Sequence, residues 1–312
     1  MAERANADQS TLAREAAPVL TQGEIDQRVF DLYDEYCHGR LDRREFLQRA
    51  SVLTIGGVSA LAMAQALLPR YALAQTISFT DQRIKARYVT YPSPGGNSGT
   101  MRGYLVQPNG AGPFPAVLVI HENRGLNPYI EDVARRAATE GFLALAPDGL
   151  SPVGGYPGND DDGRTLQAGL DQGKLRTDMV NGARFVKSHA LSTGKLGVTG
   201  FCWGGSTTNF LAVTLGADLK AGVPFYGAAA ETAGVPAIEA PLLIQYAESD
   251  ERINALWPGY EAALKASGVQ YEMYMYPGTQ HGFHNNSTPR YHEASAKLAW
   301  ERTIAFFKKH LA

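Results

Sequence analysis

The sequence predicts an α/β protein with a mostly parallel, eight-stranded sheet that helices cover on both faces. From residue 87 onward, short apolar runs rich in β-forming residues alternate with stretches of helical character. Hydrophobic residues make up 44% of the chain and charged residues 19%, which is ordinary for a packed globular protein and excludes a disordered or fibrous one. The chain therefore has enough apolar side chains for a sizeable core.

The strands follow from the apolar runs. Clusters of Pro, Gly and Asn at 92–97 and 109–113 predict turns on either side of the second run, so the first two strands are expected to be antiparallel neighbours. The eight strands are expected at residues 88–91, 101–107, 116–121, 142–146, 196–201, 221–225, 242–247 and 271–276.

Two of the helices have recognisable ends or faces. Asn127 precedes a proline at the first helical position, and Gly141 is expected to end that helix. In the last helix the spacing of Trp300, Ile304 and Phe307 predicts a stripe that faces the core rather than a cofactor.

The first 74 residues are expected to be a signal region. Residues 43–47 read Arg-Arg-Glu-Phe-Leu, a modestly apolar run covers 50–68, and Ala-Leu-Ala ends at Ala74. This order resembles a bacterial twin-arginine export signal with a cut before Gln75. We therefore expect the twin-arginine translocase as a partner during export, and a periplasmic or secreted location.

Two other interpretations of this region stay open. About 20 apolar residues would span a bilayer, so an uncleaved signal would anchor the chain to a membrane. Alternatively, Val29, Leu32 and Tyr36 recur at helical spacing and predict an amphipathic helix that belongs to the fold. With the signal removed, residues 75–312 are expected to form a single catalytic domain.

Charge and cysteine content narrow the classes of ligand. The 29 basic and 31 acidic residues form no block of one sign, so nucleic acid is not expected as a partner. The expected ligand is a small molecule. Cys37 and Cys202 are too far apart and too different in context to indicate a disulfide scaffold or a zinc site. Three consecutive carboxylates at 160–162 lack metal-ligand spacing and predict a solvated turn.

The most informative motif surrounds Cys202. Gly-Phe-Cys-Trp-Gly-Gly at 200–205 begins at the end of the fifth predicted strand and leads into a helix expected over 205–215. This is the pattern of the nucleophile elbow of α/β-hydrolases, with cysteine in place of serine. Gly200 and Gly204 let the sharp turn pass close to its neighbours, and the helix N-terminus favours a thiolate. A buried structural cysteine is the alternative.

The expected partners of Cys202 follow later strands. In this fold the order along the chain is nucleophile, acid, histidine. Asp250 comes after the seventh predicted strand and His281 after the eighth. The competing residues are the acids Glu248 and Glu251 and the histidine His284.

With these motifs, residues 87–310 resemble the dienelactone hydrolase family. The resemblance implies that Glu122, just after the third strand, contacts the resting thiol and moves away when substrate arrives. It also implies that the backbone N–H groups of Asn123 and Trp203 form the oxyanion hole. A loop ion pair with Arg124 is the alternative role for Glu122.

The expected function is cleavage of small carboxylic esters or lactones through a Cys202 acyl-enzyme, without metal or cofactor. Family members that act on dienelactone carry an arginine four residues after the histidine, where this chain has Asn285. Asn285 and Arg124 are thus the expected substrate-binding residues, with Arg164 as another candidate cation. A thioesterase, a small peptidase and a non-catalytic binding protein of the same fold are the alternatives.

Overall fold

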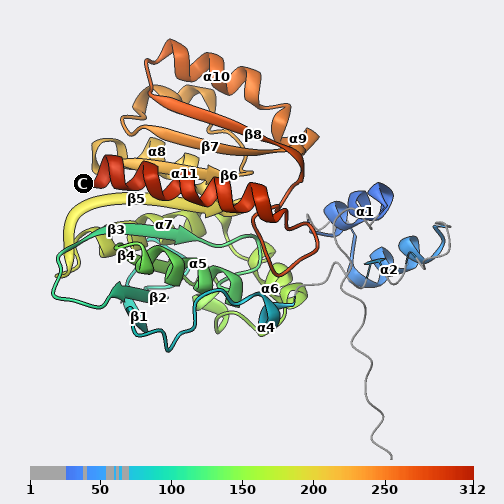
Figure 1. Cartoon of the computed structure of the whole chain (residues 1–312), viewed down its shortest axis with the longest axis horizontal. Coiled ribbons are helices and arrows are strands. Elements are labelled where there is room, and N and C mark those ends of the chain that lie inside the picture. The colour runs from blue at the N-terminus through green and yellow to red at the C-terminus, as the bar shows by residue number, and fades with distance from the viewer. Residues whose placement is uncertain (1–25, 38–40, 54–59, 61–62, 65–69) are drawn as a thin grey trace, which may run out of the picture.

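The computed structural model describes residues 26–37, 41–53, 60, 63–64 and 70–312. Their main feature is one eight-stranded sheet with helices on both faces (Figure 1), which confirms the predicted fold class. The strands are β1 (Ile84–Pro92), β2 (Thr100–Pro108), β3 (Phe114–Ile120), β4 (Leu143–Pro147), β5 (Ser192–Phe201), β6 (Ala221–Phe225), β7 (Leu242–Ser249) and β8 (Tyr271–Gln280).

The strand order places the later loops together. The order across the sheet is β1-β2-β4-β3-β5-β6-β7-β8. β1 and β2 are antiparallel, as predicted, β2 is also antiparallel to β4, and every other pair is parallel. Because β3 and β5 to β8 run in the same direction, the loops that follow them all lie at one edge of the sheet, where ligands bind in open α/β folds.

Helices cover the sheet in two layers. α5 and α11 contribute to one large apolar cluster, whereas α7, α8 and α10 contribute to another. Figure 1 shows α5 and α11 together in front of the sheet. The helices of this part are α4 (Tyr71–Ala74), α5 (Pro128–Thr139), α6 (Asp160–Ala168), α7 (Gln172–Lys187), α8 (Trp203–Leu215), α9 (Glu251–Asn254), α10 (Trp257–Ala266) and α11 (Glu293–Leu311).

The predicted helix signals are confirmed at α5 and α11. The Asn127 side chain accepts a hydrogen bond from the backbone N–H of Ile130, and Gly141 follows the helix with a φ of +100°. In α11, Ile304 and Phe307 are buried in the core, as their spacing predicted. The helix after Cys202 begins at Trp203, two residues earlier than predicted, because the strand passes into the helix through a single residue.

The N-terminal segment adds two helices beside the catalytic domain. α1 (Gln27–Cys37) buries Val29, Tyr33 and Tyr36, and α2 (Arg43–Ser51) buries Phe46 against them. The helical spacing seen in the sequence is therefore real in this stretch. Figure 1 places both helices at the right-hand side of the catalytic domain, with α2 below α1.

Much of the predicted signal region, including most of its apolar run and the Cys37 side chain, lies outside the described residues. Within the part that is described, no helix is long and apolar enough to cross a membrane. Export and cleavage before Gln75 therefore remain predictions.

Candidate active site

Cys202 lies in a strained turn between β5 and α8. Its φ of 56° and ψ of −112° are unusual for a residue with a side chain. A Cβ on Gly200 would lie 2.2 Å from the carbonyl oxygen of Gly204, and one on Gly204 would lie 2.4 Å from that of Ile120. The predicted need for glycine at both positions is confirmed. The turn holds the partly exposed thiol of Cys202, which forms no disulfide, at the loop-bearing edge of the sheet.

Asp250 and His281 form a buried pair near this thiol. Asp250 directly follows β7 and His281 directly follows β8. Their side chains are 5% exposed each, and the Asp250 Oδ2 atom lies 2.6 Å from His281 Nδ1. Of the competing acids, Glu248 accepts a hydrogen bond from the Gly278 backbone and Glu251 is exposed. The structure thus brings Asp250, and neither competitor, to the imidazole.

The surroundings of His281 favour its charged form. Burial disfavours an imidazolium, but the Asp250 carboxylate and the Cys202 sulfur outweigh this effect. Together they hold the pKa of His281 well above its usual value of 6.5.

His284 occupies a different environment, in the core. Its side chain is buried, it forms a 2.7 Å contact with the Tyr129 hydroxyl, and its ring stacks on Phe201. Burial lowers the pKa of His284 well below the usual value, with Arg136 adding to the effect, so the ring is neutral. A neutral histidine packed among aromatic rings has a structural role.

Glu122 and Asn285 are joined beside the thiol. Glu122 follows β3, is buried, and accepts a 3.0 Å hydrogen bond from the side-chain amide of Asn285. Burial raises the pKa of the Glu122 carboxyl, the Arg124 guanidinium opposes the rise, and the Cys202 sulfur adds to it. The Asn285 side-chain oxygen accepts from the backbone and hydroxyl of Ser287. Asn285 therefore holds Glu122 in this structure, and contact with substrate remains a prediction.

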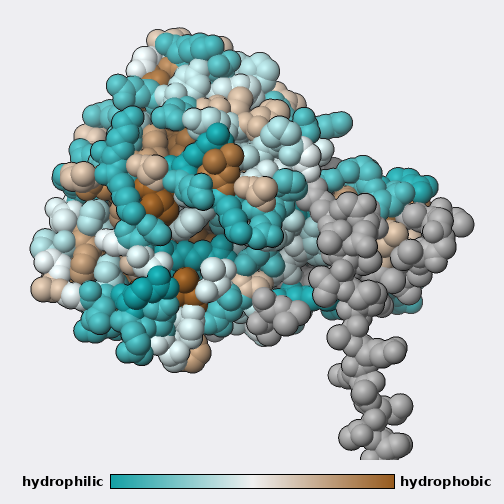
Figure 2. Space-filling model, in the orientation of Figure 1, coloured by the Kyte–Doolittle hydropathy of each residue, from teal (hydrophilic) through white to brown (hydrophobic). Residues whose placement is uncertain are grey.

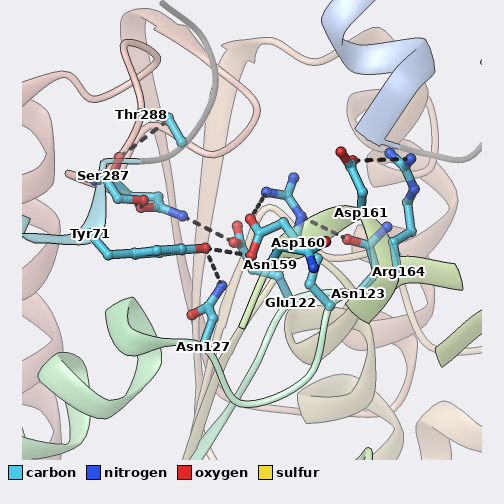
Figure 3. A network of polar contacts seen from close by, with 12 residues as sticks. Tyr71, Glu122, Asn123, Asn127, Asn159, Asp160, Asp161, Arg164, Ser287 and Thr288 are labelled. Carbon is cyan, nitrogen blue, oxygen red and sulfur yellow. Dashed lines mark hydrogen bonds and ion pairs between the residues drawn. The ribbon is translucent and has the colours of Figure 1, made fainter. Parts of the chain in front are cut away.

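Arg124 is engaged in a buried ion pair. Its guanidinium lies 2.7 Å from the carboxylate of Asp160, and the two side chains are 7% and 9% exposed. Asp160 also accepts a hydrogen bond from the hydroxyl of Tyr71 (Figure 3). The hydroxyl of Tyr156 donates another to the same carboxylate. Residues 160–162 form the first turn of α6 rather than a separate turn. The prediction of a solvated turn was also wrong for Asp160, because Arg124 and Tyr71, which are distant in the sequence, bury its carboxylate.

The expected oxyanion hole and the candidate cation Arg164 have the following positions in the structure. Trp203 is the first residue of α8, where backbone N–H groups lack intrahelical partners, and Asn123 adjoins Glu122 after β3. Arg164 lies 3.6 Å from Asp161 and over the ring of Tyr36. Neither Arg124 nor Arg164 is thus positioned by the structure as a cation reserved for substrate.

Tyr226 is a site residue that the sequence reasoning missed. It follows β6, has a φ of 36°, is fully buried, and its ring centroid lies 5.0 Å from that of His281. Burial raises the pKa of Tyr226 well above the usual value, with the charges at Glu122 and Cys202 among the lesser causes. Its position directly after a parallel strand is the feature that could have indicated that Tyr226 lies at the site.

The described residues contain no group of three or more His, Cys, Asp or Glu side chains that could hold a metal ion.

The sheet order and the turn at Cys202 define an α/β-hydrolase. The model of the dienelactone hydrolase family matches residues 101–311. The chain belongs to the dienelactone hydrolase family and is a hydrolase.

Relatives agree with this assignment. An Escherichia coli (strain K12) protein described as "Putative carboxymethylenebutenolidase" is 32% identical over 255 residues, which cover 76% of this chain and 92% of that protein. Another from the same organism, "Putative hydrolase fragment YghX", is 64% identical over 115 residues, covering 36% of this chain and 97% of the fragment. The crystal structure titled "Putative Dienelactone Hydrolase" from Klebsiella pneumoniae superposes with a TM-score of 0.62 at 28% identity, covering 72% of this chain and 99% of that chain.

The N-terminal segment has a match of its own. A second family model, described as YqhI-like, matches residues 17–55. This range includes α1 and α2, so the chain resembles known proteins on both sides of the predicted cut before Gln75.

Proposed function

We propose that the protein hydrolyses carboxylic esters or lactones with Cys202 as nucleophile, His281 as general base and Asp250 as the residue that orients the imidazole. The observation that carries the proposal is the buried 2.6 Å contact between Asp250 and His281 beside a thiol in a strained strand-to-helix turn. A nucleophile, a base and an orienting acid in that relation are the requirements for acyl transfer.

In the first half of the reaction, the Cys202 thiolate attacks the ester carbonyl carbon, and the electron pair of the C=O bond moves to oxygen. The backbone N–H groups of Asn123 and Trp203 stabilise this oxyanion, and each such donor contributes about 10² to 10³ in rate. Collapse breaks the bond to the alkoxide, which takes a proton from the His281 imidazolium. The product is a thioester on Cys202, and with a lactone the alcohol stays attached to the acyl group.

In the second half, His281 removes a proton from water as the water attacks the thioester. The carboxylic acid leaves, and Cys202 returns to a thiolate beside the protonated imidazole. Asp250 keeps the imidazole in the required tautomer and stabilises its positive charge. Glu122 restrains the resting thiol, and Asn285 positions Glu122 through the hydrogen bond between their side chains.

A substrate screen tests this function. We expect the full chain to hydrolyse short neutral aryl esters and small lactones faster than matched thioesters and peptide anilides. A profile dominated by thioesters would favour a thioesterase, and one dominated by anilides would favour a peptidase. Absence of turnover on every substrate, with a small ester still bound in a calorimetric titration, would favour a binding protein.

For the N-terminal region we propose twin-arginine export of the folded enzyme to the periplasm, supported by Arg43-Arg44 and by the small residues before Gln75. Arg43→Lys with Arg44→Lys is expected to trap the precursor in the cytoplasm, because the translocase recognises the arginine pair. Fractionation and N-terminal sequencing measure this, with Arg28→Lys as the matched control. Unchanged export of the double variant would contradict the proposal.

A further inference from the structure

A cavity of about 680 Å³ lies between α1 and the loops that carry Asp250 and His281. Phe30, Asp31 and Glu35 of α1 line one side, and both Asp250 and His281 line the other. A cavity of this size accommodates a small-molecule ligand. The N-terminal helix is therefore a wall of a space that opens onto the candidate base and its orienting acid.

α1 is attached to the catalytic domain at several points along its length. The guanidinium of Arg290, from the loop that follows His281, lies 4.7 Å from the centre of the Tyr33 ring. The guanidinium of Arg164, from α6, lies 4.1 Å from the centre of the Tyr36 ring. Near the start of α1, the side-chain amide of Gln280 donates a 2.6 Å hydrogen bond to Gln27.

These contacts hold α1 in a defined position on the catalytic domain. A cation is attracted to an aromatic ring more strongly when it is desolvated, and Arg290 is buried. Attachment at Gln27, Tyr33 and Tyr36 spans the length of the helix, so its lining side chains have defined positions over the cavity. Figure 2 shows hydrophilic side chains on the outer surface around α1, as expected for a helix that faces solvent on one side.

The lining of the cavity is acidic. Asp31 and Glu35 from α1 face the same space as Glu248 and Glu251, and these acids outnumber the cationic side chains of the lining, Arg252 and the His281 imidazolium. An excess of negative charge around a partly enclosed cavity repels anions and attracts cations. An acyl or alcohol group that enters from this side therefore encounters an apolar ring at Phe30 and a negative potential around it.

We propose, resting on ester hydrolysis at Cys202, that the cavity beside Asp250 and His281 receives part of the substrate and that α1 determines specificity as its wall. Phe30 limits the size of the ester, and Asp31 and Glu35 select neutral or cationic esters over anionic ones. This role belongs to the chain that retains residues 26–53. Removal of the leader before Gln75 would open the cavity and abolish both effects.

The size effect is tested with Phe30→Ala in the full chain. We expect kcat/KM for a bulky neutral ester, such as 4-nitrophenyl octanoate, to rise about tenfold relative to 4-nitrophenyl acetate, because specificity differences from apolar pocket volume are of this order. Phe46→Ala is the matched control, since Phe46 is buried in the same cluster of α1 and α2 as Phe30 but does not line the cavity. A ratio that is unchanged in Phe30→Ala, or that changes equally in Phe46→Ala, would overturn the size effect.

The charge effect is tested with Asp31→Asn combined with Glu35→Gln. The substrates are phenyl acetate and its 4-carboxylate and 4-trimethylammonio derivatives, which differ mainly in charge. We expect kcat/KM for the anionic ester to rise about three- to tenfold relative to phenyl acetate and the cationic ester to lose a similar factor, both differences shrinking in 1 M salt. Asp26→Asn, which alters a carboxylate outside the lining, is the control.

The outcomes separate the two proposals. If the parent enzyme hydrolyses none of these esters, the proposed function fails. If the parent is active but neither substitution in α1 changes the ratios, ester hydrolysis stands and the role of α1 is refuted.

Discussion

Cys202→Ala is expected to lower kcat for ester hydrolysis by about 10⁴-fold or more, because the acyl-enzyme cannot form without the thiol. Steady-state kinetics on 4-nitrophenyl acetate with the full chain measures the loss. The fold should be retained, since alanine occupies less space in the turn and the thiol is partly exposed. Cys37→Ser, which changes the other cysteine of the sequence, is the control and should leave kcat unchanged.

Chemical modification gives an independent measurement of the same assignment. Iodoacetamide should alkylate Cys202 and abolish hydrolysis in proportion to the adduct found by mass spectrometry. Full alkylation with activity retained would show that another group is the nucleophile. Slow alkylation together with complete loss would instead agree with a thiol restrained beside Glu122.

Asp250→Asn is expected to lower kcat by about 10⁴-fold, since the amide favours the wrong imidazole tautomer while it fills the same space. His281→Ala should lower kcat by at least the same factor. Loss of the Asp250 carboxylate also removes the main influence that raises the pKa of His281, whereas burial, which lowers it, remains. The pKa of His281 read from a titration of its imidazole should therefore fall in Asp250→Asn.

Controls for this prediction lie close by. Glu248→Gln changes the neighbouring acid, which bonds the Gly278 backbone, and should leave kcat within a small factor of the parent. His284→Ala should lower the unfolding temperature through loss of packing against Phe201, while each folded molecule keeps its activity. A larger kcat loss for His284→Ala than for His281→Ala would assign the base to residue 284.

Local motifs made most of the fold and the Cys202 region predictable. The tight turn needs glycine at positions 200 and 204, and the six-residue motif at 200–205 already contains both glycines. Asp250 and His281 were predictable for a related reason. Each directly follows a parallel strand, and such strand ends meet at one edge of the sheet.

What could not be predicted depends on contacts between distant segments. The sequence predicts Asp160 as one of three solvated acids, because only the folded chain brings Arg124 and Tyr71 to its carboxylate. The sequence predicts Asn285 as the replacement of a substrate-binding arginine. In the structure its side-chain amide donates a hydrogen bond to Glu122, which lies on another loop. The hydrophobic face of α1 was visible in the sequence, whereas the surface that it covers was not.

The attachment of α1 to Gln280 and Arg290 has a consequence for the order of events during synthesis. Gln27 and Gln280 are 253 residues apart, so a ribosome makes the helix roughly 13 to 50 s before its binding surface exists. During that interval α1 can pack against α2 but not against the loop after β8. Docking of the first helix is thus one of the last steps of folding, and it occurs only on a chain whose final strand is in place.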